Sequence, residues 1–240
     1  MFIKVLGTGG AIDSLPTSYI INTNILVDCG MEIVKKIILS KEIDNIKYVF
    51  FTHLHMDHFS GFELFCFYKI SKKQKFSVYS GSDFMDFYKQ LKCSKESFTG
   101  KNIQPFIFTE ICHLDRISIE NNVIVNIIGS NHCGKIFPNF SFLFMDSEDP
   151  FYSKKILISG DIDNPLDINN IMLQKQNIIC FHDMGWTGLE DYTELPKVHP
   201  YEEEIYNKIG PSDRLFGIHI SDKVDLKYYE KAEIDKLYFP

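Results

Sequence analysis

Residues 52–58, Thr-His-Leu-His-Met-Asp-His, restrict what this chain can fold into more than any other segment. Three imidazoles and one carboxylate lie within six positions, directly after the apolar segment Tyr48–Phe51. Alternate side chains of a turn at a strand end can converge on one point, so His53 and His55 are predicted to share a metal ion. Asp57 and His58 are then in reach of a second ion beside it. Imidazole and carboxylate ligands suit zinc, and also iron and manganese.

The alternative interpretation of this segment is a solvent-exposed, histidine-rich loop. That interpretation does not explain why the histidines follow a buried strand, or why an aspartate lies among them. Because a cluster of several ligand types is far more specific than a lone histidine, we favour the metal site.

Length and charge limit the class of protein. The chain has 240 residues, of which 45% are hydrophobic, and this length suits one domain spanning 1–240. Its formal net charge of -7 makes non-specific nucleic-acid binding less favoured, since that needs a dense Lys/Arg face. The apolar run at the N-terminus is short for a signal peptide, and no stretch approaches a membrane span. We therefore expect a cytoplasmic protein that does not bind membranes.

The six cysteines include no Cys-x-x-Cys pair, which excludes zinc-knuckle and thioredoxin-like interpretations. Most of them lie beside apolar residues, so buried free thiols in a reducing compartment are expected. The Leu6–Gly10 segment contains Gly-Thr-Gly-Gly, but no lysine or helical pattern follows it. We interpret its glycines as structural and not as a phosphate-binding loop.

Short apolar segments bounded by turn residues predict strands in both halves of the chain. They lie at Phe2–Leu6, Tyr19–Ile21, Asn24–Val27, Tyr48–Phe51, Phe76–Tyr79, Ile103–Phe108, Arg116–Ile119, Val123–Ile128, Ser141–Met145, Lys155–Ile158, Asn177–Phe181 and Arg214–Ile218. Helices are predicted at Met31–Leu39, Phe59–Ile70, from Ser82 to about Leu91, and at Tyr201–Lys208. Strands in both halves with helices outside them favour a layered α/β sandwich.

The 52–58 segment resembles the signature of the metallo-β-lactamase superfamily, and the other expected ligands follow in order. They are His132 after the strand Val123–Ile128, Asp161 after Lys155–Ile158, and His219 after Arg214–Ile218. The resemblance implies an αββα sandwich, with two mixed β-sheets flanked by helices. It also implies two divalent metal ions, zinc in first place and manganese or iron as alternatives. One ion is expected on His53, His55 and His132, the other on Asp57, His58 and His219, with Asp161 bridging them.

Within the superfamily the chain looks most like the ribonuclease Z branch. An aspartate at position 161, where true β-lactamases commonly have cysteine, points to hydrolases of phosphodiesters, thioesters or lactones. The resemblance implies that Asp183 and His199 form a dyad that protonates the leaving group, with His182 near the substrate. The interval between His132 and Asp161 has no room for the arm by which ribonuclease Z grips tRNA, so a compact phosphodiesterase is expected.

The sequence therefore predicts a dinuclear hydrolase, a phosphodiesterase that acts on a small phosphodiester or nucleotide by attack of a metal-bound hydroxide. Asp57 is expected to orient that hydroxide. The alternatives are a lactonase or thioesterase of the same fold, and an arm-less ribonuclease Z-like nuclease. A metal-stabilised sensor and a di-iron redox protein fit less well, because the ligand set is complete and no segment remains for a flavin domain. Trp186 lies in a loop that is either a substrate lid or an anchored turn, and a homodimer is left open.

Overall fold

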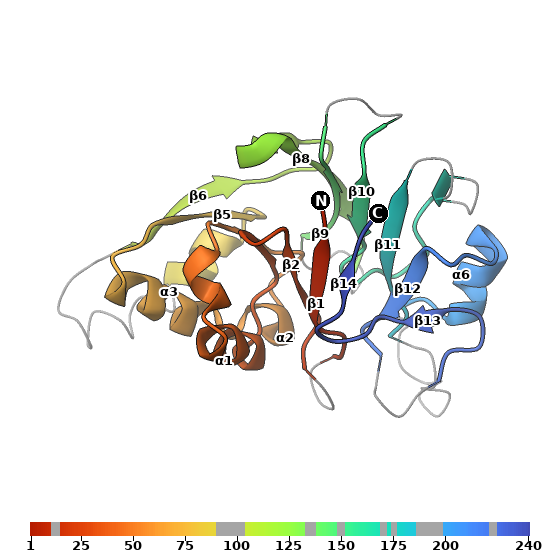
Figure 1. Ribbon diagram of the computed structural model, residues 1–240, viewed down its shortest axis with the longest axis horizontal. Helices are drawn as coiled ribbons and strands as arrows, with labels where there is room; N and C mark the ends of the chain where they lie inside the picture. The colour runs from red at the N-terminus through yellow and green to blue at the C-terminus, as the bar shows by residue number, and fades with distance from the viewer. Residues whose placement is uncertain are drawn as a thin grey trace.

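The structure is a computed structural model that describes residues 1–10, 15–89, 104–132, 138–147, 152–168, 172–173, 177–185, 199–220 and 225–240. Over these residues the chain forms two seven-stranded sheets that pack face to face. Helices cover the outer faces of the two sheets (Figure 1). The αββα sandwich expected from the sequence is confirmed.

The first sheet has the strand order β14-β1-β2-β3-β4-β5-β6. Strands β1 to β3 are antiparallel, whereas β3 to β6 are parallel. The two ends of the chain meet here, because β1 pairs antiparallel with β14 (Figure 1). The strands are β1 (Ile3–Gly7), β2 (Ser18–Ile21), β3 (Ile25–Val27), β4 (Tyr48–Phe50), β5 (Phe76–Ser80), β6 (Phe106–Glu110) and β14 (Leu237–Tyr238).

The second sheet has the order β13-β12-β11-β10-β9-β8-β7. Strands β7 to β10 are antiparallel and β10 to β13 are parallel. Strands β8, β10, β11 and β12 consequently run in one direction and end at one edge of the sheet. The strands are β7 (Arg116–Ile119), β8 (Val123–Ser130), β9 (Asn139–Met145), β10 (Lys155–Ile158), β11 (Ile178–Asp183), β12 (Leu215–Ile218) and β13 (Glu230–Lys231).

Three apolar layers hold the sandwich together. The central layer lies between the sheets and contains Phe50, Phe142 and Phe181. A second layer, rich in phenylalanine, packs α1 and α3 on the first sheet, and a third packs α6 on the second sheet. The helical segments are α1 (Met31–Leu39), α2 (Met56–Phe59), α3 (Phe62–Ser71), α6 (Glu202–Ile209), the 3₁₀ turns Glu42–Asn45 and Glu120–Asn122, and residues 84–89.

The prediction of a single helix at Phe59–Ile70 is wrong. The structure has two helices here, α2 and α3, on either side of Gly61. A Cβ atom at residue 61 would lie 2.5 Å from the carbonyl oxygen of Gly30. The chain therefore crosses the start of α1 here with no room for a side chain. Strand β6 also begins later than expected, and the short strands β13 and β14 were not predicted.

Some expectations fall on residues that the structure does not describe. Trp186, Cys93 and Cys133 lie outside the described residues. Of the described cysteines, Cys29, Cys66 and Cys180 are buried and Cys112 is exposed. None of the helices within the described ranges has both the length and the apolar character needed to cross a bilayer.

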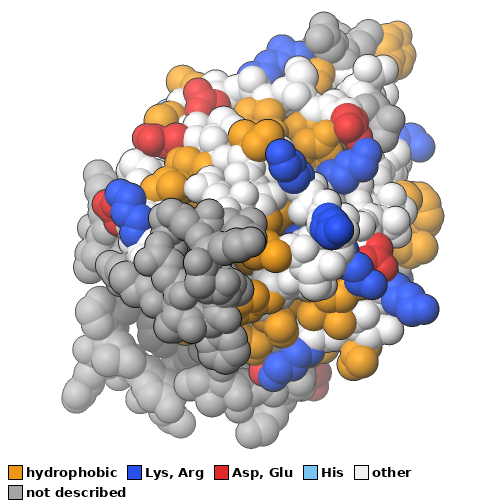
Figure 2. Space-filling model, turned by 90° about the vertical axis from the view of Figure 1, so that its left-hand side faces the viewer, with side chains coloured by type: hydrophobic (Ala, Val, Ile, Leu, Met, Phe, Trp, Pro, Cys, Tyr) orange, Lys and Arg blue, Asp and Glu red, His pale blue; other side chains and the backbone are white. Residues whose placement is uncertain are grey.

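Figure 2 shows a face on which lysine and arginine side chains lie among apolar and uncharged atoms, with acidic side chains beside several of them. The charge on the described part of this face is therefore mixed.

Lys69 on α3 is a buried cation that holds the turn before β4. Its ammonium group donates hydrogen bonds to the carbonyl oxygens of Ile43 at 2.6 Å and Ile46 at 2.8 Å, and to Gln74 Oε1 at 2.9 Å. These acceptors would lose their partner if the lysine were shortened, and unsatisfied buried acceptors are costly.

Lys69→Ala is therefore expected to reduce the free energy of unfolding by about 2–3 kcal/mol, measured by urea denaturation. The matched control is Lys75→Ala at an exposed position, with an expected change of less than about 0.5 kcal/mol. Equal losses in the two variants would contradict a structural role for the buried ammonium group.

Candidate metal centre

The first ligand cluster combines side chains from both sheets. His53 and His55 lie on the turn after β4, His132 follows β8, and Asp161 follows β10. Ligand atoms of these residues all lie within 4.8 Å of one another. His53 Nε2 lies 3.6 Å from Asp161 Oδ2, and His132 Nε2 lies 3.9 Å from the same oxygen. The ends of strands from different sheets thus supply one cluster.

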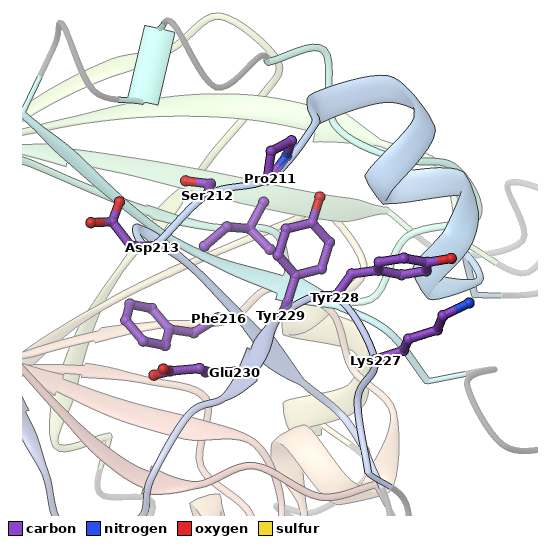
Figure 3. Close-up of a pocket in the computed structure, with 9 residues that line it drawn as sticks. Pro211, Ser212, Asp213, Phe216, Lys227, Tyr228, Tyr229 and Glu230 are labelled. Carbon is purple, nitrogen blue, oxygen red and sulfur yellow. The ribbon is translucent and has the colours of Figure 1, made fainter.

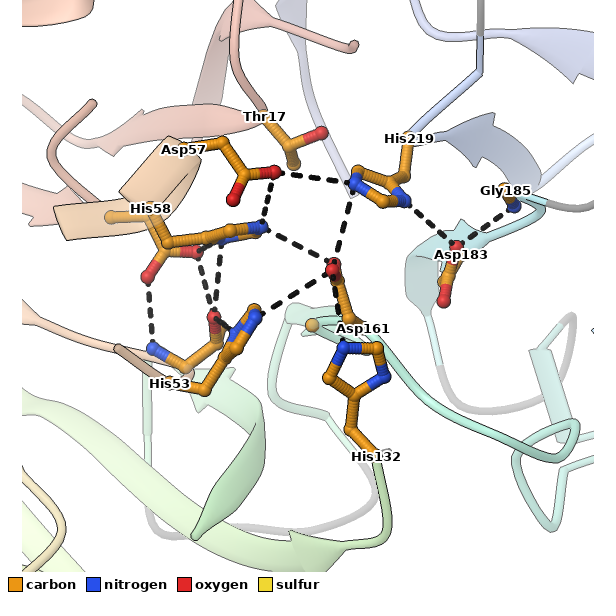
Figure 4. Close-up of polar contacts among 12 residues, drawn as sticks. Thr17, His53, Asp57, His58, His132, Asp161, Asp183, Gly185 and His219 are labelled. Carbon is orange, nitrogen blue, oxygen red and sulfur yellow. Dashed lines mark hydrogen bonds and ion pairs between the residues drawn. The ribbon is translucent and has the colours of Figure 1, made fainter. Parts of the chain in front are cut away.

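The second cluster lies on the other side of Asp161. It consists of Asp57, His58, Asp161 and His219, whose ligand atoms also lie within 4.8 Å of one another. His219 Nε2 lies 3.5 Å from both Asp57 Oδ2 and Asp161 Oδ2. His58 Nε2 lies 3.4 Å from Asp161 Oδ1 and 3.5 Å from Asp57 Oδ2. Asp161 belongs to both clusters, as a bridging ligand must (Figure 4).

The buried atoms that face one another fit divalent cations. Among the described residues, His53 Nε2, His58 Nε2, His219 Nε2 and Asp161 Oδ1 are buried and have no hydrogen-bond partner. Nearly all buried polar atoms in proteins have a partner, because leaving one unsatisfied is costly. Here the unsatisfied atoms converge, and they are nitrogen and oxygen atoms of the types that zinc accepts. The donor set therefore fits metal binding.

A second layer of side chains fixes the orientation of the ligand histidines. Asp28 Oδ2 lies 2.8 Å from His58 Nδ1, and Thr52 Oγ1 lies 3.1 Å from His53 Nδ1. Asp163 Oδ1 is 3.8 Å from His132 Nδ1, and Asp183 Oδ1 is 3.6 Å from His219 Nδ1. With Nδ1 of each ring turned to an outer partner, Nε2 faces the centre. Such outer partners set the tautomer and raise the basicity of a ligand.

Asp28 is itself fixed by the strand end that carries the first histidines. Its carboxylate accepts hydrogen bonds from the Thr52 backbone N–H at 2.9 Å and from the Thr52 hydroxyl at 2.8 Å. Asp28 and Asp163 are not among the site residues predicted from the sequence. A signal was present for Asp28, since it directly follows β3 in the same way that the ligands follow their strands.

The carboxylates in the centre are held in their charged form. Burial raises the pKa of Asp161, but the neighbouring His219 and His58 have a larger, opposite effect. The pKa of Asp161 therefore lies well below its ordinary value. Burial lowers the pKa of His58, but Asp161 and Asp28 outweigh this and raise it well above the ordinary value. Negative charge dominates this buried region, and a cation between the carboxylates would compensate it.

A third cluster joins Asp183, His199 and His219. His199 Nδ1 lies 2.7 Å from Asp183 Oδ2. Asp183 is fully buried and also accepts backbone N–H bonds from Ile162 and Gly185, both at 2.9 Å. Burial raises the pKa of Asp183, but His199 and His219 lower it well below its ordinary value. The carboxylate is therefore a fixed anion shared by two imidazoles.

The structure brings together the seven ligands predicted from the sequence, in the two groups that were predicted. Asp183 and His199 also lie together, and the ring of His199 is 4.6 Å from the ring of His219 and 5.1 Å from that of His132. The expectation that His182 contacts substrate does not fit its position. His182 is fully buried, its Nδ1 bonds the Asp183 carbonyl, and its Nε2 accepts the Leu166 N–H. Burial lowers its pKa to about 4, and we interpret it as a neutral packing residue.

A separate pocket of about 510 Å³ lies at the other end of β12 (Figure 3). Lys227, Tyr228 and Tyr229 line one side of it, and Asp213 and Phe216 line another. Strand β12 begins at Leu215 in this pocket, and His219 follows the opposite end of the strand. None of the residues of the two ligand clusters lines the pocket. We therefore assign the chemistry to the metal centre.

Comparisons with known proteins agree with this geometry. The family model described as "Anti-Pycsar protein Apyc1" matches residues 1–213. Among curated proteins, no sequence matches the chain. Similar solved structures include the metallo-β-lactamase fold protein YhfI from Bacillus subtilis, with a TM-score of 0.71 and 12% identity over 100% of this chain and 99% of that one.

Two further structures are similar along nearly their whole lengths. The short form of human tRNase Z has a TM-score of 0.68 and 19% identity, over 99% of this chain and 98% of that one. A diphosphatase of the PhnP family has a TM-score of 0.67 and 13% identity, over 99% and 96%. At these identities the similarity shows the fold alone, and that fold is the metallo-β-lactamase fold expected from the sequence.

Asp28→Asn tests the outer layer. The amide keeps the size of the carboxylate but loses its charge, so His58 is held less well. We expect the affinity for divalent metal to fall by about 10–100-fold in competition with a chelator. The control is Asp86→Asn, an exposed carboxylate remote from the clusters. Unchanged affinity in Asp28→Asn would mean that His58 needs no outer partner.

Proposed function

The chain belongs to the anti-Pycsar protein Apyc1 family, and from the geometry of its metal centre we propose that it is a metal-dependent phosphodiesterase. Its substrate is a small phosphodiester or a nucleotide. The observation that carries this proposal is the 2.7 Å contact between His199 and the buried Asp183, directly beside the two ligand clusters. That pair is suited to protonating a poor leaving group.

We propose two divalent ions, with zinc as the favoured metal. His53, His55 and His132 would hold one ion, Asp57, His58 and His219 the other, and Asp161 both. Two such ions supply positive charge for the phosphoryl oxygens and lower the pKa of a water molecule towards neutrality.

Asp57 is the residue best placed to orient the attacking water. Its Oδ2 lies 3.5 Å from both His58 Nε2 and His219 Nε2, at the edge of the second cluster. Burial raises its pKa, but His219 and His58 lower it well below the ordinary carboxyl value. Asp57 therefore stays an acceptor, and it can receive a hydrogen bond from the water that attacks phosphorus.

His199 is the proposed proton donor. Because Nδ1 contacts Asp183, Nε2 is the atom from which the ring would protonate the departing oxygen. The ring lies beside ligands of both clusters, close to His132 and His219. Asp183 fixes the tautomer and stabilises the charged ring, in the way that a carboxylate orients a catalytic histidine.

A lactonase or thioesterase of the same fold is the second candidate, since the metal ligands suit it equally. The Asp183–His199 pair favours the phosphodiesterase. An alkoxide leaves phosphorus poorly without a proton, whereas a thiolate leaves carbon readily. A dedicated acid is therefore worth more to a phosphodiester than to a thioester, and the substrate panel below separates the phosphodiesterase from the lactonase.

A substrate panel tests the proposal. Bis-p-nitrophenyl phosphate and a cyclic nucleotide should be hydrolysed by the metal-loaded protein, while a lactone and a thioester should turn over at least about 100-fold more slowly. Preferred hydrolysis of the lactone or thioester would replace the phosphodiesterase by the second candidate. Efficient cleavage of a precursor tRNA trailer would indicate a ribonuclease Z-like nuclease instead.

Elemental analysis tests the ligand assignment. The purified protein should contain close to two divalent ions per chain, because two clusters share Asp161. His53→Ala combined with His55→Ala should remove the first ion and keep the second. The control is His113→Ala, which removes an exposed imidazole outside both clusters and should leave the metal content unchanged. Full occupancy in the double variant would show that these histidines are not ligands.

His199→Ala tests the proton donor through the leaving group. A nitrophenolate leaves without a proton, so bis-p-nitrophenyl phosphate should lose activity only modestly. In a cyclic nucleotide the leaving group is a ribose alkoxide, which needs a proton. The rate of cyclic nucleotide hydrolysis should therefore fall by about 10²–10⁴-fold. Equal losses on both substrates with intact metal would show that His199 binds substrate without donating a proton.

Asp183→Asn should show the same dependence on leaving group more weakly. In addition, its 3.6 Å contact with His219 predicts weaker binding of the second ion. A change in leaving-group dependence without any change in metal affinity would mean that Asp183 serves His199 alone.

A further inference from the structure

The backbone of Gly185 is in close contact with the side chains of His219, His199 and Asp183. A Cβ atom at this position would be 2.8 Å from His219 Nδ1, 2.9 Å from His199 Cγ and 3.2 Å from Asp183 Oδ1. Packed carbon atoms essentially never come closer than 3.0 Å to such atoms. The His219 and His199 rings therefore pack against the backbone of residue 185, where a side chain has no room.

Asp183 explains why both rings lie so close to this backbone. Asp183 is the last residue of β11, and its short side chain keeps the carboxylate close to the strand. The Gly185 N–H donates a hydrogen bond to Asp183 Oδ1 at 2.9 Å. The same carboxylate contacts His199 at 2.7 Å and His219 at 3.6 Å. To contact Asp183, both rings lie close to the end of β11. They therefore also lie close to the backbone of Gly185.

His219 has little space to move away from Gly185. On its other side, a Cβ atom at Gly10 would lie 3.0 Å from His219 Nε2. The backbone of His219 is also fixed in the left-handed region, with φ at +60°. The His219 ring thus lies close to two glycine backbones. A Cβ atom at residue 185 would displace it, and one at residue 10 would leave it little room to move.

We infer that Gly185 is a positioning residue whose missing side chain sets the spacing between His199 and His219. One backbone position then aligns the proposed proton donor with a ligand of the second metal. The inference rests on the proposed function for the role of His199, whereas the contact with His219 concerns metal binding alone.

Metal titration of Gly185→Ala tests the inference. The methyl group should displace His219, so the second ion should bind about 10–100-fold more weakly while the first ion binds as in the unmodified protein. The matched control is Gly129→Ala, where the new Cβ atom would meet the Cβ of the exposed His113 at 3.0 Å. That control adds the same methyl group against a histidine outside the clusters, and both ions should bind normally.

Thermal unfolding of the metal-free protein gives a second readout that needs no activity. Gly185→Ala should lower Tm, and the loss should be smaller when the methyl group is introduced into His199→Ala, which lacks the Cγ atom at 2.9 Å. If Gly185→Ala alone does not fold, recovery of folding in the double variant supports the inference. Unchanged affinity for the second ion, an equal Tm loss in both backgrounds, or failure of both variants to fold would overturn it.

These readouts remain informative if the proposed function fails. A protein that hydrolyses no phosphodiester would disprove the role of His199 as an acid. It would leave the metal affinity and Tm of Gly185→Ala as independent measures of the packing at residue 185.

Discussion

The contacts of the Asp161 carboxylate are the interaction on which the rest of the structure depends. Asp161 is buried between two groups of histidines, and its oxygens lie within 3.4–3.9 Å of four imidazole nitrogens. A buried charge is stable only when it is paired or coordinates a metal. The sandwich meets this condition by ending β4, β8, β10 and β12 at one place, so that ligands distant in sequence surround one anion.

The metal centre and the proposed acid form one unit. Asp183 contacts His199 with one oxygen and His219 with the other, and both rings rest on Gly185. A change at Asp183 is therefore expected to affect both the proposed proton donor and His219, a candidate ligand of the second cluster. Asp28 also contacts two parts of the centre. Its carboxylate accepts a hydrogen bond from Thr52 after β4 and contacts the candidate ligand His58. Rates of variants in this region are interpretable only beside their metal content.

The fold and the ligand set could be predicted because residues 52–58 resemble the metallo-β-lactamase signature. That resemblance implies His132, Asp161 and His219 as the other ligands, and each of them follows an apolar strand. Strands β13 and β14 were missed because each has two residues and depends on a distant neighbour for pairing. His182 was misjudged because its partners are backbone atoms of Asp183 and Leu166, which no side-chain pattern reveals. Asp28 contacts His58 across 30 positions, and the sequence does not show such a contact.

Anomalous diffraction from crystals of the metal-loaded protein, recorded at the absorption edge of the bound metal, tests the central claim most directly. The account predicts two peaks, one beside His53, His55 and His132 and the other beside Asp57, His58 and His219, with Asp161 in contact with both. Peaks located elsewhere, or a single peak that Asp161 does not contact in a fully loaded crystal, would contradict it.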